Sequence, residues 1–350
     1  MKRALAAAAT MVATLAGGCS GGDTEPTDAR ETSTEVPAAE AVAAVPSPGC
    51  DRGATAQADR TEGGIDVRGA ARRFLLSAPA QEEGDNPLPL VLDFHGLAEG
   101  ADIHAEMTRL GPLGVEEGFV TVFPHGTGEP VRWDVGTDPK ANDDLAYVDA
   151  LLDHVGRERC IDTSRVYATG LSNGAMMASA VGCAMADRVA AIAPIAGILL
   201  PEPCEPARPV PVFTIHGTAD PILLFNGGIG TEVLDSALGG VGGDGATTTT
   251  APPDLDGPGY PETVRAWAAL GGCDPDSAED ERVGDEVIRR TFDCPEDAPV
   301  EFLIVEGGGH SWPSSEFSRS IEGVVGHTTF EVDASAAVWA FVRQFHLPGP

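Results

Sequence analysis

The stretch RVYATGLSNGAMMASAV, residues 165–181, joins a short apolar run to an alanine-rich run through one serine between two glycines. The first run is typical of a buried strand and the second has the spacing of a helix. Their junction, 170–174, matches Gly-x-Ser-x-Gly, a strand-to-helix turn that strains the serine backbone and exposes its hydroxyl. The chain holds 43 glycines, so the motif alone is weak support for a nucleophile at Ser172.

Later parts of the chain supply the partners that a serine nucleophile needs. A histidine must act as base and a carboxylate must orient it, in the chain order serine, acid, histidine. Asp220 follows the expected strand 210–215, and His310 stands in a glycine-rich loop after the expected strand 300–305. We therefore predict Ser172, Asp220 and His310 as the catalytic residues. The alternatives are Asp235, Asp254 or Asp256 as the acid and His327 as the base, whereas His216 precedes the acid and His346 is expected on the surface.

Acyl transfer also requires hydrogen-bond donors for the oxyanion that develops on the substrate. One candidate is the backbone N–H of Asn173, directly after the serine. The other is the backbone N–H of Leu97, in the loop that follows LVLDFHG. We expect the His95 side chain to be buried and to pin this loop rather than to react.

The remaining pattern predicts an α/β fold with a mostly parallel sheet and helices on both faces. Its apolar runs are continuous rather than alternating, as in strands that are covered on both sides. Asp143 and Asp144 begin a helical stretch, where we expect them to cap the helix rather than to catalyse. Residues 225–260 read as a long inserted loop, either a lid or disordered. The expected strands are 88–94, 119–123, 165–169, 189–195, 210–215 and 300–305.

The first residues resemble an export signal. Lys2 and Arg3 precede an alanine-rich run that ends at Gly18, so residues 1–18 are predicted to be a signal peptide. Cys19 follows small residues as in a bacterial lipobox, with Ala16 in the position usually held by leucine. We favour lipidation of Cys19 over simple secretion, with contact to a membrane only through that anchor. Residues 19–48 would be a disordered tether, and 49–350 one catalytic domain.

Six cysteines remain after Cys19, an even number that suggests three disulfides in an exported chain. Six cysteines allow 15 pairings, and the sequence leaves the pairing open. Proximity along the chain favours two short loops and leaves the first two cysteines for each other. A zinc site is disfavoured because no Cys-x-x-Cys pair or His-Glu-x-x-His helix occurs, and no metal is expected. The favoured pairs are Cys50 with Cys160, Cys183 with Cys204, and Cys273 with Cys294.

The chain is strongly acidic, with 54 Asp and Glu against 22 Lys and Arg and a formal net charge of −32. Such a surface repels phosphate groups. The charge therefore argues against nucleic acid and against an anionic membrane surface as partners.

Several motifs together resemble a known enzyme family. They are LDFHG, VFPHG, RVYATGLSNGAMMA, IHGTADPIL and GGGHSWP, in this order. They are similar to the α/β-hydrolase esterases of the poly(3-hydroxybutyrate) depolymerase and feruloyl esterase family, across nearly all of residues 85–345. The resemblance implies an α/β-hydrolase fold with Ser172, Asp220 and His310 as its triad. Trp133 and Trp312 would line the substrate cleft, although packing beneath loops is an equal alternative.

The resemblance implies an exported serine esterase that needs no cofactor. Its expected substrates are feruloyl or acetyl esters of plant oligosaccharides or short hydroxyalkanoate esters, with a poly(3-hydroxybutyrate) depolymerase as the alternative. Only 5% of the residues are aromatic, which argues mildly against attack on crystalline polymer. The competing hypothesis from another class is a catalytically silent protein that binds a polymer or glycan at the cell surface. The insertion 225–260 and Ala175, where a third glycine is common, depart from the family pattern.

Overall fold

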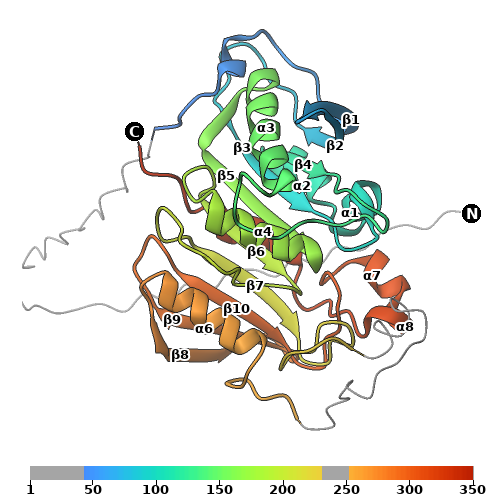
Figure 1. Cartoon of the computed structure of the whole chain (residues 1–350), viewed down its shortest axis with the longest axis vertical. Coiled ribbons are helices and arrows are strands. Elements are labelled where there is room, and N and C mark those ends of the chain that lie inside the picture. Colours follow the sequence, from blue (N-terminus) through green and yellow to red (C-terminus); the bar gives the residue numbers. More distant parts are fainter. Residues whose placement is uncertain (1–42, 231–251, 350) are drawn as a thin grey trace, which may run out of the picture. The chain divides into compact units, whose positions relative to one another are not determined.

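A computed structural model describes residues 43–230 and 252–349. Its centre is a ten-stranded sheet with the strand order β1-β2-β4-β3-β5-β6-β7-β10-β9-β8 (Figure 1). The run from β4 to β10 is parallel, so the expected α/β class with a mostly parallel sheet is confirmed. All six expected strands are present. They are β3 (Leu88–Phe94), β4 (Val120–Pro124), β5 (Ile161–Leu171), β6 (Ala191–Ile195), β7 (Val212–Gly217) and β10 (Val300–Val305).

Four further strands were not expected from the sequence. They extend the sheet by antiparallel pairing at both ends. The outermost two are largely polar and exposed, so they lack the continuous hydrophobicity that reveals a central strand. These strands are β1 (Ala58–Val67), β2 (Ala70–Ala78), β8 (Asp274–Arg282) and β9 (Val287–Asp293).

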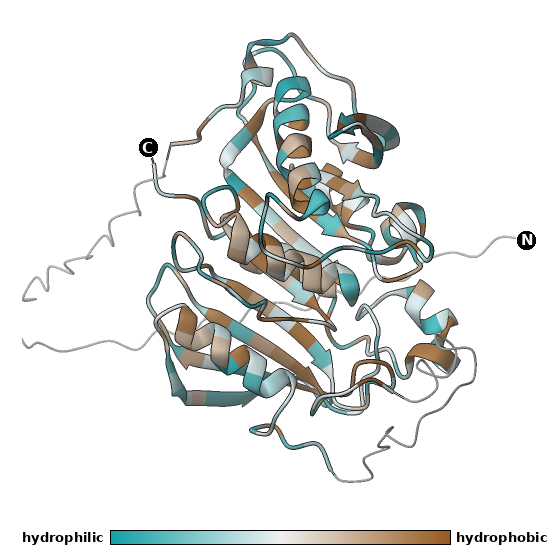
Figure 2. Cartoon of the chain, in the orientation of Figure 1, coloured by the Kyte–Doolittle hydropathy of each residue, from teal (hydrophilic) through white to brown (hydrophobic). Residues whose placement is uncertain are grey.

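Helices cover both faces of the sheet, as the continuous apolar strands require. Leu90 and Leu92 of β3 pack in one core with α3, α4 and α6, whereas Val91 packs in the other with α1, α2 and α9. Figure 2 shows the apolar residues gathered on the central strands and on α4. No helix in the described ranges has the length and hydropathy needed to cross a membrane. The helices are α1 (Gly100–Thr108), α2 (Leu110–Glu117), α3 (Asp143–Glu158), α4 (Asn173–Ala184), α6 (Tyr260–Leu270), α7 (Glu316–Ser320), α8 (Glu322–Val325) and α9 (Ala334–Val342), with a 3₁₀ turn at Pro48–Asp51.

The packed part of the chain begins before the expected boundary at residue 49. The backbone N–H of Ser47 donates to the Ile161 carbonyl at 2.8 Å, and that of Val45 donates to Asp162 Oδ1 at 2.9 Å. Attachment through backbone hydrogen bonds leaves no apolar pattern in the sequence, which is why the predicted tether extends too far. Cys19 and the predicted signal peptide lie outside the described residues.

Three disulfides join the domain, and their pairing is the one that chain proximity favours. Two close loops across 21 positions, and the third joins positions 110 apart. In the chain-entropy account, each short loop stabilises the fold by about 3 kcal/mol and the long one by more. The pairs are Cys50–Cys160, Cys183–Cys204 and Cys273–Cys294.

Both described ends of the predicted insertion 225–260 are tied together. The Asn226 side chain donates to the Asp254 carbonyl and accepts from the Asp254 N–H, and the Tyr260 N–H donates to the Phe225 carbonyl. Residues 231–251, including the alternative acid Asp235, lie outside the described residues.

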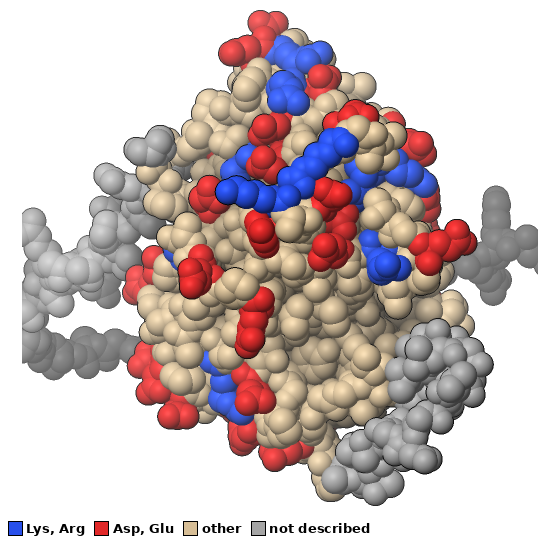
Figure 3. Space-filling model, viewed as in Figure 1, with Lys and Arg blue, Asp and Glu red and all other residues tan. Residues whose placement is uncertain are grey.

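Charged side chains are unevenly spread over the face drawn in Figure 3. They gather over the half that holds β1 to β4 and along the margin near β8 and β9, and a largely uncharged area lies between these groups. Most of the basic side chains on this face lie beside acidic ones (Figure 3). Surface ion pairs of the chain include Arg68–Asp143 and Arg282–Glu306.

Candidate active site

Ser172, Asp220 and His310 stand at one edge of the sheet. Ser172 directly follows β5, Asp220 comes three residues after β7, and His310 comes five residues after β10. These strands are parallel and are adjacent through β6 in the order β5-β6-β7-β10. Carboxyl ends of parallel strands meet at the same edge, where α/β folds hold their ligands.

Ser172 has the strained backbone that the turn demands. Its φ is 57° and its ψ is −120°, a conformation that residues with a side chain rarely adopt. A Cβ at Gly170 or Gly174 would lie 2.4 or 1.9 Å from the Phe94 carbonyl oxygen, so both positions must be glycine. Helix α4 begins at Asn173 and presents its amino-terminal N–H groups beside the serine.

Asp220 and His310 form a buried hydrogen bond, with 2.7 Å between Asp220 Oδ2 and His310 Nδ1. The Asp220 carboxylate can only accept, so Nδ1 carries the proton and Nε2 is left as an acceptor. Asp220 Oδ1 accepts from the N–H groups of Ile222 and Leu223, both at 2.8 Å. The imidazoles of His310 and His216 hold the pKa of Asp220 well below its usual range despite burial.

His216 contacts the same carboxylate from its other side. Its Nε2 lies 3.1 Å from Asp220 Oδ2 and 2.9 Å from the Leu223 carbonyl oxygen, so it donates a proton to acceptors. The ring stacks on Tyr260 with 3.6 Å between centroids. His216 Nδ1 is buried without a hydrogen-bond partner among the described residues.

The alternative acids and bases that lie within the described residues do not join this cluster with their side chains. Asp254 lies in a turn with Asn226, and Asp256 is exposed beside Arg290. His327 is half-exposed with its Nε2 3.1 Å from Glu286, and His346 lies on the surface.

The two predicted oxyanion donors are free in the described part of the chain. Neither the Leu97 nor the Asn173 backbone N–H donates to an acceptor there. The loop of Leu97 borders the serine, because a Cβ built on Gly96 would lie 3.7 Å from Ser172 Cβ. Both donors therefore fit the role predicted for them.

His95 is buried and pins this loop, as expected. Its Nε2 accepts from the Gly126 N–H at 2.9 Å, so Nδ1 carries the proton and donates to the Gly96 carbonyl at 2.7 Å. Burial lowers the pKa of His95 to about 4, which keeps the ring neutral near pH 7.

Neither tryptophan offers a ring to a substrate in this structure, which corrects the prediction that they line a cleft. Trp133 is 3% exposed and donates its Nε1–H to the His95 carbonyl at 2.9 Å. Trp312 is 1% exposed and donates its Nε1–H to Ser335 Oγ at 3.0 Å. Both pack beneath loops, the alternative that the sequence had left open.

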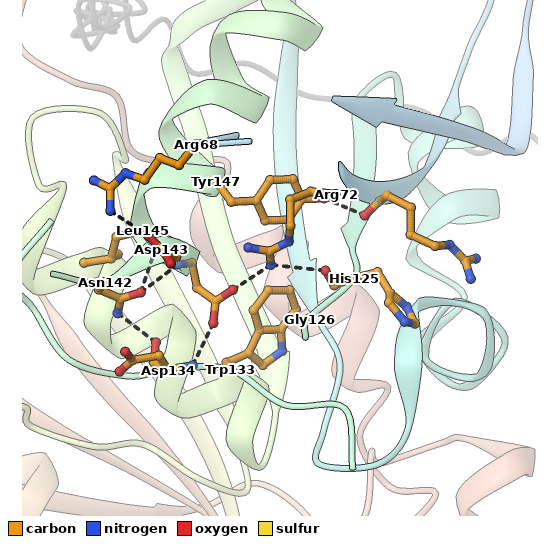
Figure 4. Close-up of polar contacts among 12 residues, drawn as sticks. Arg68, Arg72, His125, Gly126, Trp133, Asp134, Asn142, Asp143, Leu145 and Tyr147 are labelled. Carbon is orange, nitrogen blue, oxygen red and sulfur yellow. Dashed lines mark hydrogen bonds and ion pairs between the residues drawn. The ribbon is translucent and has the colours of Figure 1, made fainter. Parts of the chain in front are cut away.

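A buried ion pair between β2 and the start of α3 was not predicted from the sequence. Arg72 and Asp144 lie 2.6 Å apart, and Arg72 also covers the Tyr147 ring and contacts the His125 carbonyl (Figure 4). Asp144 Oδ2 accepts from the Asp134 N–H, which fixes the chain next to Trp133.

Contrary to the prediction from the sequence, Asp143 and Asp144 at the start of α3 do not cap the helix with their side chains, and each has a different partner. Asn142 is the residue whose side chain caps α3, accepting from the N–H groups of Asp144 and Leu145. Exposed Asp143 pairs with Arg68. Strand β2 carries two adjacent arginines, Arg72 and Arg73, ahead of an apolar run. An arginine that is buried in such a strand requires a charged partner, and this was the sequence signal for Asp144.

Comparison with known proteins gives relatives that agree with this fold. Feruloyl esterase B of Piromyces equi is 25% identical over 284 residues, covering 79% of this chain and 46% of that protein. The chain thus spans less than half the length of this relative. The solved acetyl xylan esterase from Aspergillus awamori has the same fold, with a TM-score of 0.51 at 14% identity over 75% of this chain and 98% of that one.

Two findings concern the family. Residues 74–234 match the family described as Esterase PHB depolymerase. The putative esterase NocK of Nocardia uniformis subsp. tsuyamanensis is 32% identical over 270 residues, covering 72% of this chain and 74% of that protein. With its α/β-hydrolase fold and these matches, the chain belongs to the esterase PHB depolymerase family.

Proposed function

We propose that the chain is an exported serine esterase that hydrolyses carboxylic esters through an acyl-enzyme. The observation that carries the proposal is the buried His310–Asp220 hydrogen bond at the sheet edge that also holds the strained Ser172. The free N–H groups of Leu97 and Asn173 support it, since acyl transfer needs donors for an oxyanion. A catalytically silent binding protein would not need this combination.

In the first half of the reaction, the Ser172 hydroxyl attacks the ester carbonyl carbon and His310 Nε2 takes its proton. The carbonyl oxygen becomes an oxyanion that accepts from the N–H groups of Leu97 and Asn173. Asp220 remains ionised and stabilises the imidazolium. Collapse of the tetrahedral intermediate breaks the ester C–O bond, and His310 gives its proton to the departing alcohol.

In the second half, a water molecule attacks the acyl carbon and His310 Nε2 takes one of its protons. Collapse of this intermediate breaks the bond to Ser172 Oγ, which recovers the proton from His310. The acid leaves and the serine is free again. No step requires a metal or an organic cofactor.

We propose esters of plant polysaccharides, feruloyl or acetyl, as the substrate class. The proteins named feruloyl esterase and acetyl xylan esterase among the relatives support this choice. The family description supports a polyester of hydroxybutyrate as the second candidate. The buried tryptophans contribute no aromatic platform to either substrate in this structure.

Export is supported by the three disulfides, which persist in oxidising compartments. We propose that Cys19 carries a lipid that holds the enzyme at the cell surface. Labelling of the wild-type protein but not of Cys19→Ser with a radioactive fatty acid in a bacterial host would support this. Equal label in both proteins would contradict it.

The experiment for the catalytic proposal compares wild-type protein with Ser172→Ala on methyl ferulate and on a soluble 3-hydroxybutyrate trimer. Loss of the nucleophile should reduce kcat by about 10⁶-fold while the fold persists. The control is Ser320→Ala, because Ser320 is exposed at the end of α7 and its hydroxyl donates to the Phe317 carbonyl. This control should retain activity.

The outcomes separate the candidates. Faster Ser172-dependent cleavage of methyl ferulate supports the plant-ester substrate, and faster cleavage of the trimer supports the polyester. Equal hydrolysis by wild type and Ser172→Ala would contradict the catalytic role of this serine. No hydrolysis, together with no labelling of Ser172 by a fluorophosphonate, would favour the silent binding protein.

A further inference from the structure

The two peptide groups that flank Gly96 have four polar atoms: the His95 carbonyl oxygen, the Gly96 nitrogen, the Gly96 carbonyl oxygen and the Leu97 nitrogen. Side chains form hydrogen bonds with the first three of them. The His95 carbonyl accepts from Trp133 Nε1 at 2.9 Å. The Gly96 N–H donates to Glu99 Oε2 at 2.5 Å, and the Gly96 carbonyl accepts from His95 Nδ1 at 2.7 Å. The fourth atom, the Leu97 N–H, is the one without an acceptor in the described part of the chain.

These contacts fix the direction of the free N–H. In a trans peptide the C=O and the following N–H point in opposite directions. With the Gly96 carbonyl directed to the buried His95 ring, the Leu97 N–H must point the other way. The neighbouring side chain of Leu97 is 50% exposed, so this part of the loop faces the open side of the site.

Glu99 contacts the loop where it is closest to the serine. A Cβ built on Gly96 would lie 3.0 Å from Glu99 Oε2 and 3.7 Å from Ser172 Cβ, so Gly96 is close both to the carboxylate and to the serine. The turn that returns Glu99 to Gly96 is tight, with Ala98 at φ 64° and Gly100 at φ 78°.

A buried histidine lies beside the Glu99 carboxylate at ion-pair distance, and its Nδ1 makes no hydrogen bond among the described residues. His104 of α1 lies with Nδ1 3.2 Å from Glu99 Oε2 and Nε2 2.7 Å from Asp93 Oδ1. Asp93 Oδ2 also accepts from the Thr108 hydroxyl at 2.7 Å. The two carboxylates outweigh burial and raise the pKa of His104 to about 10, so the ring is an imidazolium at neutral pH.

We propose that Glu99 is a positioning residue that aims the Leu97 N–H at the oxyanion of the reaction. This inference rests on the proposed esterase function. Glu99 touches neither the substrate nor Ser172 Oγ in the proposed reaction; it acts through the Gly96 backbone.

The charges of Glu99, His104 and Asp93 give different expectations for a positioning role of Glu99 and for a purely structural role. One imidazolium and two carboxylates carry a net charge of −1, and removal of Glu99 leaves the neutral pair His104–Asp93. A buried neutral pair keeps its mutual partners, so the fold should tolerate the loss. The reaction should not, because one oxyanion donor is worth about 10² to 10³ in kcat.

The test measures kcat, KM and Tm for p-nitrophenyl acetate hydrolysis by wild type, Glu99→Ala, Glu99→Gln and Glu99→Asp. Glu99→Ala should lose about 10²-fold in kcat with KM changed by less than about threefold. Glu99→Gln retains an oxygen that accepts from Gly96, so it should recover at least about tenfold of that loss. Glu99→Asp keeps the charge beside His104 but is one methylene shorter, so its kcat should fall below that of Glu99→Gln.

Glu106→Ala is the matched control, because Glu106 lies on α1, which Glu99 directly precedes, and it is exposed and pairs with Arg60 at 2.9 Å. Its kcat should equal that of wild type. If Glu99→Ala and Glu99→Asp keep the kcat of this control while hydrolysis still depends on Ser172, the role of Glu99 is wrong and the esterase proposal stands. If wild-type turnover does not depend on Ser172, both are wrong. If Glu99→Ala does not fold, the kcat values of Glu99→Asp and Glu99→Gln provide the test. A lower kcat for Glu99→Asp supports the role of Glu99, and a kcat for Glu99→Asp equal to or above that of Glu99→Gln contradicts it.

Discussion

Two buried clusters at the same sheet edge use the same residue types in opposite ratios. After β7 and β10, one carboxylate, Asp220, lies between two imidazoles, with His310 at 2.7 Å and His216 at 3.1 Å. Beside β3, one imidazole, His104, lies between two carboxylates, with Asp93 at 2.7 Å and Glu99 at 3.2 Å. The distances within the two clusters are alike, whereas the ratio of carboxylates to imidazoles is reversed.

The ratio decides what each cluster can do. Two carboxylates raise the pKa of His104 to about 10, so this ring keeps its proton at neutral pH and serves as a fixed cation. In the other cluster the single carboxylate stays ionised, because both imidazoles hold the pKa of Asp220 low. His310 then has one oriented nitrogen left over for proton transfer. These opposite ratios agree with the proposed roles, which are proton transfer for the Asp220 cluster and positioning for the His104 cluster.

Among changes within the two clusters, the largest effect should come from Asp220→Asn. The amide can donate to His310 Nδ1, which favours the tautomer with the proton on Nε2, and this nitrogen then cannot accept from Ser172. We expect kcat to fall by about 10⁴-fold with little change in KM. Asp256→Asn, at an exposed acid that pairs with Arg290, is the control and should leave kcat unchanged. A loss below about tenfold in Asp220→Asn would show that Asp220 does not orient the base.

The second effect concerns stability rather than rate. In His104→Gln, Asp93 and Glu99 lose the cation between them, which should reduce the free energy of unfolding by about 3 to 5 kcal/mol at pH 7. Urea unfolding followed by fluorescence measures this value. A stability equal to that of wild type would mean that the His104 cluster is not an ion cluster.

His104→Gln should also change the pH dependence. The pKa of His104 is about 10 in the folded chain against 6.5 in the reference state, so its stabilisation is complete below pH 6.5 and is lost as pH rises through 10. Wild type should therefore lose up to about 1.4 kcal/mol per pH unit from this group between pH 7 and 9.5, and the variant should lose less. This window ends below the range in which buried Tyr147, Tyr167 and Tyr260, whose pKa values burial raises, begin to titrate.

The Asp220 cluster and the central strands could be predicted from the sequence, whereas the outer strands could not. Ser172, Asp220 and His310 could be predicted from their order in the chain and from their positions after apolar runs. The parallel topology places the ends of these strands at one edge of the sheet. The central strands are predictable for the same reason. The polar outer strands β1 and β8 are not, since pairing with a neighbour holds them in place without an apolar pattern.

The His104 cluster escaped prediction for a different reason. Glu99 and His104 stand in a stretch, DFHGLAEGADIH, that is rich in titratable residues, yet their contacts depend on the turn at Ala98 and Gly100. Only that backbone turns Glu99 back onto Gly96. Likewise, the sequence around Trp133 and Trp312 does not distinguish a tryptophan that lines a cleft from one that packs in a core. Only the tertiary packing determines that both are buried.

The smallest effect should come from His216→Phe, which keeps a ring on Tyr260 but removes the donor to Asp220. Asp220 keeps its bonds from His310, Ile222 and Leu223. It is ionised both before and during the reaction, so the lost bond weakens the ground state and the transition state alike. We expect kcat to fall less than about tenfold and stability by about 2 kcal/mol, measured by initial rates and urea unfolding. A fall in kcat near that of Asp220→Asn would mean that both imidazoles take part in proton transfer, and the ratio of the groups would then not determine their roles.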